Sequence, residues 1–198
     1  VSGRGRKNPD RYPMRVNMYN RSLKDLRIYY FKPDHGYRVN DINQLNNITC
    51  GEAFIKLLST YLVCFVDDMV SCSPYIVCKF FEVLSSGSLL LASLNHTKTY
   101  FDKLGFVDGE DYISVTEDNL SDKIDYVMDI NNIELINKIR HSGFLKCKKY
   151  HNCNHRALQL NEIITNDKSV TKFDDGLNGT YKSTFSDFIK ILRFNKKY

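Results

Sequence analysis

The chain contains short runs of apolar residues that have the length of a strand and do not alternate between apolar and polar positions. Runs of this kind are typical of strands in a parallel sheet that is covered by helices on both faces. The predicted strands are residues 26–31, 61–66, 89–92 and 112–115, and residues 1–2 have the character of the end of a further strand.

The segments between these runs carry apolar residues at helical spacing. They predict helices over residues 12–22, 49–58, 74–85, 97–104, 120–128, 133–146 and 155–165. Thr49 followed by Glu52 forms a capping-box pattern, and Gly87 follows the end of the third helix. Strands that alternate with helices predict an α/β fold over residues 1–165, a Rossmann-like parallel sheet with helices on both faces. Residues 166–198 are predicted to form a polar linker and a C-terminal helical tail.

Charge is distributed unevenly along the 198 residues. Residues 1–40 have ten basic and three acidic side chains (net +7), residues 41–140 have seven and fifteen (net −8), and residues 141–198 have eleven and five (net +6). A protein that binds nucleic acid through its overall charge does not usually have an acidic middle. The pattern favours a local anion site near the N-terminus, with phosphate as the obvious anion; the alternative is a solvated basic surface.

The cysteines and the ends of the chain bear on cellular context. Six cysteines are present, none forms a CxxC pair, and Cys64 and Cys78 lie in apolar segments, which favours a reduced, cytoplasmic protein. No apolar run is long enough to span a bilayer, and no apolar leader follows the basic first residues. Because the sequence begins with Val, we expect it to be a piece of a longer protein or a processed product.

Two groups of side chains raise the question of a metal. Four potential zinc ligands lie within nine residues, namely Cys147, His151, Cys153 and His155. Structural zinc normally takes two ligand pairs from separated segments, so a polar loop between two helices is the preferred interpretation and zinc the alternative. Asp67 and Asp68 also suggest a metal site, but they end a buried strand and are expected to begin a turn.

Ligands of an open parallel sheet bind at the carboxyl ends of its strands, where the amino ends of helices direct amides towards anions. This rule directs attention to the loops at residues 3–6, 32–37, 67–74 and 93–97. Neither a Walker lysine motif nor GxGxxG is present, so P-loop and classical dinucleotide binding lack their requirements. Residues 2–6 (SGRGR) form a weak phosphate-loop pattern, with a flexible basic terminus as the alternative.

Residues 78–93 (CKFFEVLSSGSLLLAS) resemble the donor-site segment of GT-B glycosyltransferases. Further segments are similar, in the same order, to the C-terminal half of the spore-protein-like and viral-type glycosyltransferases. These segments are residues 1–3 (VSG), 12–15 (YPMR), 35–37 (HGY, similar to a His-Pro-Gly-Tyr element without its Pro), 104–113 (LGFVDGEDYI), and His151 with Arg156. The resemblance covers residues 1 to about 165, which correspond to one Rossmann-like half of a GT-B fold.

The resemblance implies a hexosyltransferase domain that binds a nucleotide sugar without a metal or another cofactor. It implies that Glu82 holds the ribose hydroxyls, that Lys79 meets the pyrophosphate, and that the small Ser-Ser-Gly turn allows close approach of the ligand. The substrate-binding residues implied in this way are Gly3, Arg4, Arg6, Arg15, His35, Tyr37, Tyr75, Lys79, Glu82, Ser86 and Gly87. The expected partner is an N-terminal half, which in this fold usually supplies the acceptor site and often the catalytic base.

Several of these assignments have structural alternatives. Lys79 stands three residues before Glu82, so an ion pair along the helix is the plain alternative to phosphate contact. Arg15 could be an exposed helix residue, His35 a turn residue, and Tyr37 and Tyr75 packing residues. Many retaining members have a second glutamate at the position of Pro74, so the stereochemical outcome stays open.

Two other classes of function are compatible with the sequence. One is a nucleotide-binding or interaction module without turnover. The other is a nucleic-acid-binding protein that uses the basic ends of the chain, although no recognised module supports it.

Overall fold

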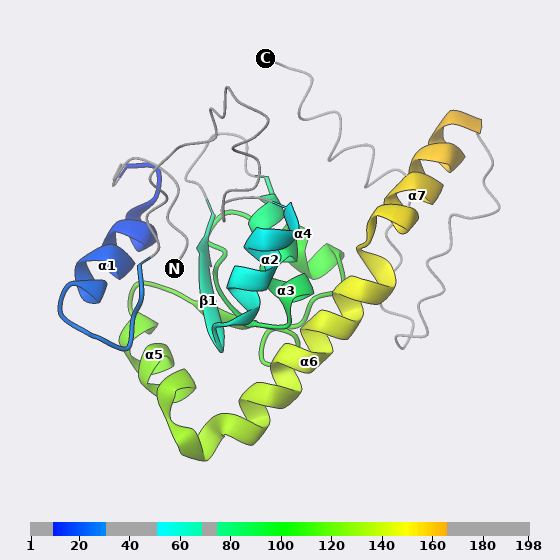
Figure 1. Ribbon diagram of the computed structural model, residues 1–198. Coiled ribbons are helices and arrows are strands. Elements are labelled where there is room, and N and C mark those ends of the chain that lie inside the picture. The colour runs from blue at the N-terminus through cyan, green and yellow to red at the C-terminus, as the bar shows by residue number, and fades with distance from the viewer. Residues whose placement is uncertain (1–9, 31–50, 69–74, 166–198) are drawn as a thin grey trace.

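The computed structural model describes residues 10–30, 51–68 and 75–165 of the chain. In these ranges two helices precede β1, strands and helices alternate from β1 to β3, and further helices follow β3 (Figure 1). In chain order the elements are α1 (Pro13–Ser22), α2 (Gly51–Ser59), β1 (Val63–Asp67), α3 (Cys78–Ser86), β2 (Leu89–Ser93), α4 (Lys98–Lys103), β3 (Ile113–Val115), α5 (Leu120–Met128), the 3₁₀ turn η2 (Ile130–Asn132), α6 (Ile133–Tyr150) and α7 (Cys153–Thr165).

The strands form a parallel sheet in the order β1-β2-β3. In register, Asp67 pairs with Ser93 and Ser93 pairs with Val115, so the last residues of the strands lie along one edge of the sheet. Because α3 connects two parallel neighbours, it begins near the carboxyl end of β1 and returns to the amino end of β2.

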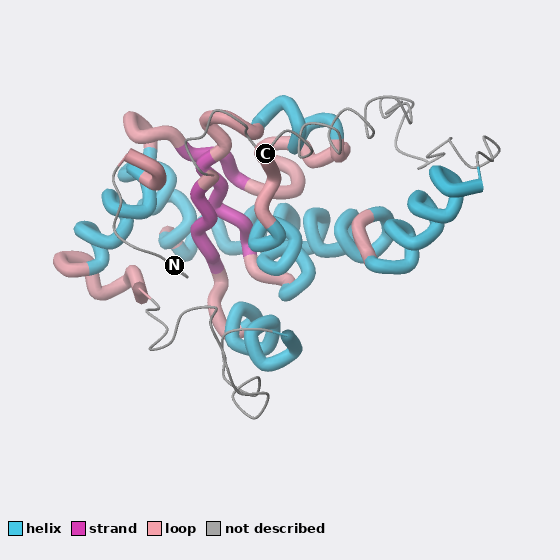
Figure 2. The backbone as a smooth tube through the Cα atoms, turned by 90° about the horizontal axis from the view of Figure 1, so that it is seen from above, coloured by secondary structure: helices cyan, strands magenta, loops and turns pink. Residues whose placement is uncertain are grey.

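Helices cover both faces of the sheet, as the view from above shows (Figure 2). Alternate residues of each strand point to opposite faces, which divides the core into two clusters. The first cluster joins β1 and β2 to α2, α3 and α4, and the second joins the strands to α1 and α5. α6 contributes to both clusters, through Cys147 in the first and through Ile136 and Ile139 in the second.

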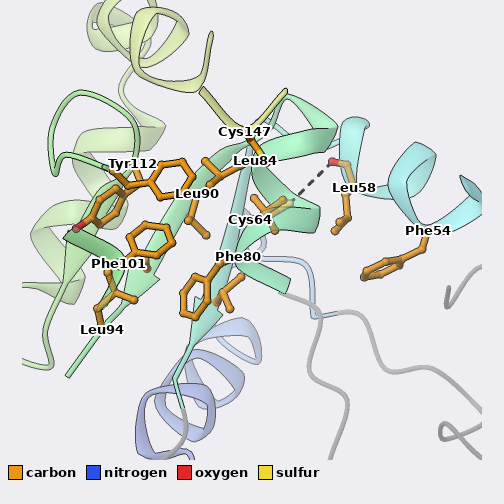
Figure 3. Close-up of a cluster of buried hydrophobic side chains, with 14 residues drawn as sticks. Phe54, Leu58, Cys64, Phe80, Leu84, Leu90, Leu94, Phe101, Tyr112 and Cys147 are labelled. Carbon is orange, nitrogen blue, oxygen red and sulfur yellow. Dashed lines mark hydrogen bonds between the residues drawn. The ribbon is translucent and has the colours of Figure 1, made fainter. Parts of the chain in front are cut away.

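The first cluster is dominated by aromatic rings and leucines (Figure 3). Phe80 and Phe101 are fully buried, and their ring centroids lie 5.4 Å apart. The Cys64 thiol, also buried, contacts the Leu58 carbonyl at the end of α2 at 3.9 Å. The fully apolar strands predicted from the sequence are therefore buried on both sides, as expected for a parallel sheet with two helical layers.

The predicted α/β class, a Rossmann-like parallel sheet between helices, is confirmed. β1, β2 and β3 coincide with three predicted strands to within two residues at either end, and α5 has the predicted bounds. α6 continues four residues further than predicted, to Tyr150. The predicted strand at residues 1–2, the start of the second helix at residues 49–50 and the tail at residues 166–198 lie outside the described residues.

The predicted strand at residues 26–31 is wrong over its described part, because residues 26–30 form turns and irregular structure. The local cause is Asp25, whose carboxylate accepts from both the backbone N–H and the side-chain Nε of Arg27 at 3.0 Å. A side chain that bonds nearby backbone in this way competes with strand pairing. The tyrosines of the segment pack on tyrosines of other segments, Tyr29 stacking on Tyr61 with ring centroids 5.7 Å apart.

The third helix begins at Cys78, later than the predicted start at residue 74. Val77 before it has extended backbone angles, φ −79° and ψ 146°. Its end is as predicted, since Gly87 adopts the left-handed conformation at φ 78° and closes the helix. Among the described helices, none combines the length and the apolar character that a membrane crossing requires.

Candidate functional site

Asp67 ends β1 at the carboxyl edge of the sheet and is almost completely buried, with 3% of its surface exposed. Its Oδ2 accepts the backbone N–H of Arg15 at 2.9 Å, and Ser93 is its neighbour at the end of β2. Burial raises the pKa of Asp67 from 3.8 to about 6, although the Arg15 N–H, the Ser93 side chain and the Arg15 charge act in the opposite direction. A carboxylate is thus held inside the edge where ligands of parallel sheets bind.

Arg15 lies in the first turn of α1, on the face of the sheet that α1 covers. The residue is 9% exposed, and its guanidinium carbon lies 3.8 Å from the centroid of the Tyr12 ring. The structure therefore excludes the alternative of an exposed helix arginine. It brings a cation to the carboxyl end of β1, next to Asp67.

Asp68, the next residue, holds the loop that follows β2. Its Oδ2 accepts the backbone N–H groups of His96 and Thr97 at 2.8 and 3.0 Å, and the Thr97 hydroxyl at 3.0 Å. In return, the Asp68 N–H donates to the Ser93 carbonyl at 3.1 Å. The two aspartates therefore fix two different segments at one edge, Asp67 the start of α1 and Asp68 the loop before α4.

Lys79 and Glu82 lie one turn apart on α3, which covers the opposite face of the sheet from α1 (Figure 1). Both are half-buried, and their spacing of three residues places them on one side of the helix, next to the face that buries Phe80, Val83 and Leu84. Lys79 is in the first turn, which begins near the carboxyl edge. Lys79 and Arg15 therefore approach this edge from opposite faces of the sheet.

Ser86 and Gly87 are placed at the other end of α3, beside the amino end of β2. The Ser86 hydroxyl donates to the Val83 carbonyl at 2.7 Å, and the Gly87 carbonyl accepts from Arg140 at 2.7 Å. The structure does not bring these two residues together with Lys79 at the carboxyl edge. Their observed contacts close the helix and join it to α6.

The remaining predicted site residues divide into two groups. Tyr75 is 46% exposed just before α3, so it is not a core packing residue. The others lie outside the described residues, namely Gly3, Arg4, Arg6, His35 and Tyr37.

A second buried carboxylate, Asp111, lies before β3 and is completely inaccessible. It forms a buried ion pair with Lys146 of α6, and accepts the Ser142 hydroxyl at 2.7 Å and the Val107 N–H at 2.8 Å. Lys146 also donates to the Gly105 carbonyl at 2.7 Å. The contacts of Lys146 and Ser142 bind α6 to the segment at residues 104–113, so the segment that resembles the glycosyltransferases has a structural role here.

Close packing of α6 at this point requires a glycine. A Cβ atom at Gly143 would come within 2.2 Å of the Asp111 carbonyl oxygen. The helix can therefore lie directly on the backbone of the neighbouring segment only where the side chain is missing.

His151 and Arg156 also have structural contacts. His151 Nε2 lies 2.9 Å from the Leu104 carbonyl, its Nδ1 lies 2.9 Å from the Arg156 guanidinium, and its ring stacks on Phe106. Burial is the main cause, and the Arg156 charge a second one, that lowers the pKa of His151 to about 3. The ring is thus neutral, with Nε2 donating to the carbonyl and Nδ1 accepting from Arg156.

The four potential zinc ligands are dispersed among other contacts. Cys147 is buried against Ser85 of α3 with the sulfur 3.1 Å from the hydroxyl, and Cys153 is exposed. In the described ranges no three histidine, cysteine or acidic side chains are grouped so that they could hold a metal ion.

The positioning contacts of Asp67 and Asp68 were not predicted from the sequence, which suggested only a metal site or the start of a turn for this pair. One signal was available: a polar residue ends each of two neighbouring apolar strands, Asp67 in β1 and Ser93 in β2. Polar side chains at adjacent strand ends are expected to meet at the ligand edge.

Comparison with known proteins agrees with this architecture. A family model described as glycosyl transferase-like matches residues 37–162. This range includes the whole described sheet and helices α2 to α6. No curated protein and no solved structure shows significant similarity to the chain. Since the match covers more than half of its residues, the chain belongs to the glycosyl transferase-like family.

Proposed function

We propose that this chain is the donor-binding domain of a glycosyltransferase that uses a nucleotide sugar and transfers its hexosyl group to an acceptor. The observation that carries the proposal is the buried Arg15 at the carboxyl end of β1, with Lys79 on the opposite face of the same edge. Two cations at a strand edge match the two negative charges of a diphosphate. Family membership supplies the reaction class, glycosyl transfer.

In this proposal the cations stabilise the leaving group. Cleavage of the bond between the sugar and the diphosphate transfers negative charge to the diphosphate oxygen. Lys79 and one of Arg4, Arg6 and Arg15 would neutralise that charge. Preorganised cations lower the barrier because the protein does not have to reorganise as the charge develops.

Glu82 would orient the donor through its ribose. Its carboxylate can accept hydrogen bonds from both ribose hydroxyls at once. Glu82 is placed one turn after Lys79 on α3, so the two side chains lie on the same side of one rigid helix. Holding the ribose and the diphosphate on one element would keep the anomeric carbon in register with the acceptor.

The acceptor is proposed to be held by a second α/β half, as in the GT-B arrangement that the sequence resembles. The carboxyl edge of the sheet, with Arg15 and Lys79, would then form one wall of the cleft. Catalysis by this domain requires that both walls are present, because the acceptor hydroxyl must reach the anomeric carbon within about 3–3.5 Å.

The proposal is tested by the binding of nucleotide sugars to the chain. A thermal-shift panel of UDP-, GDP-, dTDP- and CMP-sugars, with single-stranded and double-stranded oligonucleotides for comparison, should give stabilisation by at least one nucleotide sugar. The best ligand is then measured by calorimetry, with the matching nucleoside as a probe of the diphosphate contribution. Stabilisation by oligonucleotides alone, or by no member of the panel, would contradict the proposal.

A further inference from the structure

Arg15 makes one contact through its backbone and one through its side chain. At the backbone, its N–H donates to the buried carboxylate of Asp67 at 2.9 Å. At the far end, the guanidinium turns back along α1 and lies over the ring of Tyr12, with its carbon 3.8 Å from the ring centroid. Pro13 stands between the two residues at the start of the helix and restricts the backbone there.

Tyr12 stands at the N-cap position of α1 but makes no side-chain capping bond. The carboxylate of Asp67, 52 residues away in the sequence, instead accepts the free N–H in the first turn. The Tyr12 ring is therefore available for a different contact. In the structure this contact is with the Arg15 guanidinium, at a distance typical of a cation–π interaction.

The orientation of the guanidinium has a consequence for an anionic ligand. A free arginine side chain has many rotamers, and binding an anion restricts most of them. A guanidinium already held against a ring loses less freedom, so more of the interaction energy appears as affinity. Tyr12 directly precedes α1, so the contact directs the guanidinium towards the amino end of the helix. There its charge acts on Asp67 at the carboxyl end of β1.

We propose that Tyr12 is a positioning residue that holds the Arg15 guanidinium for the diphosphate of the donor. This inference rests on the proposed function and adds to it a residue outside the predicted donor contacts. Tyr12 acts through Arg15 and does not itself touch the ligand.

The experiment measures the affinity of the best nucleotide sugar of the panel, and of its matching nucleoside, for a set of variants. Tyr12→Leu removes the aromatic face and keeps an apolar side chain, while Tyr12→Phe keeps the face and is the matched control. Arg15→Gln removes the cation, and the double variant closes a mutant cycle. Thermal unfolding of each variant shows that the measured protein is folded.

Tyr12→Leu is expected to weaken the nucleotide sugar by about 2- to 30-fold, the range that corresponds to a cation–π contact. Tyr12→Phe should bind within about twofold of the native chain, because the ring face is retained. Neither variant should change the affinity of the nucleoside, which has no diphosphate. In the Arg15→Gln background, Tyr12→Leu should cause no further loss.

Three results would overturn the inference: an equal loss for the nucleoside, a loss that persists in the Arg15→Gln background, or native affinity of Tyr12→Leu for the nucleotide sugar. If Tyr12→Leu does not fold, Tyr12→Met replaces it with the same expectations. Failure of the whole panel to bind the native chain is a different result, because it removes the proposed function and this inference with it.

Discussion

Two buried aspartates, Asp67 and Asp111, occupy opposite roles in this molecule. Asp111 forms an ion pair with Lys146, and it also accepts a serine hydroxyl and a backbone N–H. Asp67 accepts the backbone N–H of Arg15, and the Arg15 guanidinium lies over the ring of Tyr12. In the first case the cation faces the carboxylate directly, and in the second it is turned over an aromatic ring.

The difference separates a structural site from the proposed functional one. The Asp111 cluster joins α6 to the segment before β3 and lies away from the carboxyl edge of the sheet. Asp67 lies at that edge, where burial raises its pKa to about 6 and the charge of the neighbouring Arg15 acts in the opposite direction. Incompletely compensated carboxylates are common at functional sites, while fully paired ones are common in stable cores.

The largest expected effect is the loss of stability when the ion pair between Asp111 and Lys146 is broken. Lys146→Met leaves Asp111 buried without its cation and is expected to lower the free energy of unfolding by about 3–5 kcal/mol. Urea denaturation measures the change, with Lys103→Met, at an exposed position of α4, as the matched control. Combining Lys146→Met with Asp111→Asn should recover part of the loss. A decrease below about 1 kcal/mol would mean that the pair contributes little net stability.

The second prediction concerns the pH dependence of Asp67. Its pKa is raised by burial, so the folded state binds a proton more tightly than the unfolded state. Ionisation of this buried group therefore lowers the free energy of unfolding progressively as the pH rises from about 4 to about 6. Above that range the reduction stays constant. Asp67→Asn removes this reduction and keeps one acceptor oxygen for the Arg15 N–H.

The difference in unfolding free energy between Asp67→Asn and the native chain should increase with pH. A shift of roughly two pKa units sets an upper limit of about 3 kcal/mol on the increase between pH 4 and pH 7. Urea denaturation at several pH values measures it, with Asp118→Asn, at an exposed position, as the control. Using the difference removes the contribution of His151, whose lowered pKa makes stability fall as the pH decreases from 6.5 to about 3. A difference that is constant across this range would show that Asp67 ionises normally in the folded chain.

The third prediction concerns Glu82 and its proposed contact with the ribose of the donor. If Glu82 accepts from the ribose hydroxyls, Glu82→Gln keeps the shape of the side chain and loses the charge. Charged hydrogen bonds contribute about 1.5–3 kcal/mol, so calorimetry should show at least about tenfold weaker binding of the best nucleotide sugar. Stability should change by less than about 0.5 kcal/mol, because the half-buried carboxylate is not part of the packed core.

Two controls make the Glu82 experiment specific. Glu134→Gln, at an exposed position in the first turn of α6, should leave the affinity unchanged. A 2′,3′-dideoxy nucleotide should lose affinity for the native chain and little more for Glu82→Gln, since both changes delete the same contact. If Glu82→Gln unfolds the domain with unchanged affinity per folded molecule, Glu82 has a structural role and the donor assignment fails.

The smallest expected effect is that of divalent metal. We predict that the affinity for the best nucleotide sugar is the same in EDTA and in magnesium. Asp67 and Asp68 already accept hydrogen bonds from backbone and hydroxyl groups of the chain, and cationic side chains would neutralise the diphosphate. Binding that occurs only with magnesium would contradict the prediction and would make the two aspartates candidate ligands.

Local sequence determined most of the fold. The apolar runs that became β1, β2 and β3 have no polar face, and only a layer of helices on each side can bury them. Residues 26–30 show the limit of such patterns. Their aromatic and β-branched side chains favour a strand, but Asp25 binds the backbone of Arg27. The two tyrosines of the segment pack on Tyr19 and Tyr61.

Only part of the proposed donor site could be predicted from the sequence. Lys79 and Glu82 stood out because they are close together in a segment that resembles known donor sites, and helical spacing alone places them on one side of α3. Ser86 and Gly87 belong to the same segment, yet the direction of α3 separates them from the carboxyl edge by the length of the helix.

Tertiary structure alone decided which distant residues meet. The sequence contains Arg15, Asp67 and Ser93 as separate polar residues, and their contact depends on the register of two strands and the packing of α1 on the sheet. The same holds for Asp111 and Lys146, which are 35 residues apart. Periodicity and propensity act over a few residues, so they define elements. Burial and the pairing of charges act between elements. These forces determined that Asp111 joins α6 to the core and that Asp67 lies at the carboxyl edge of the sheet.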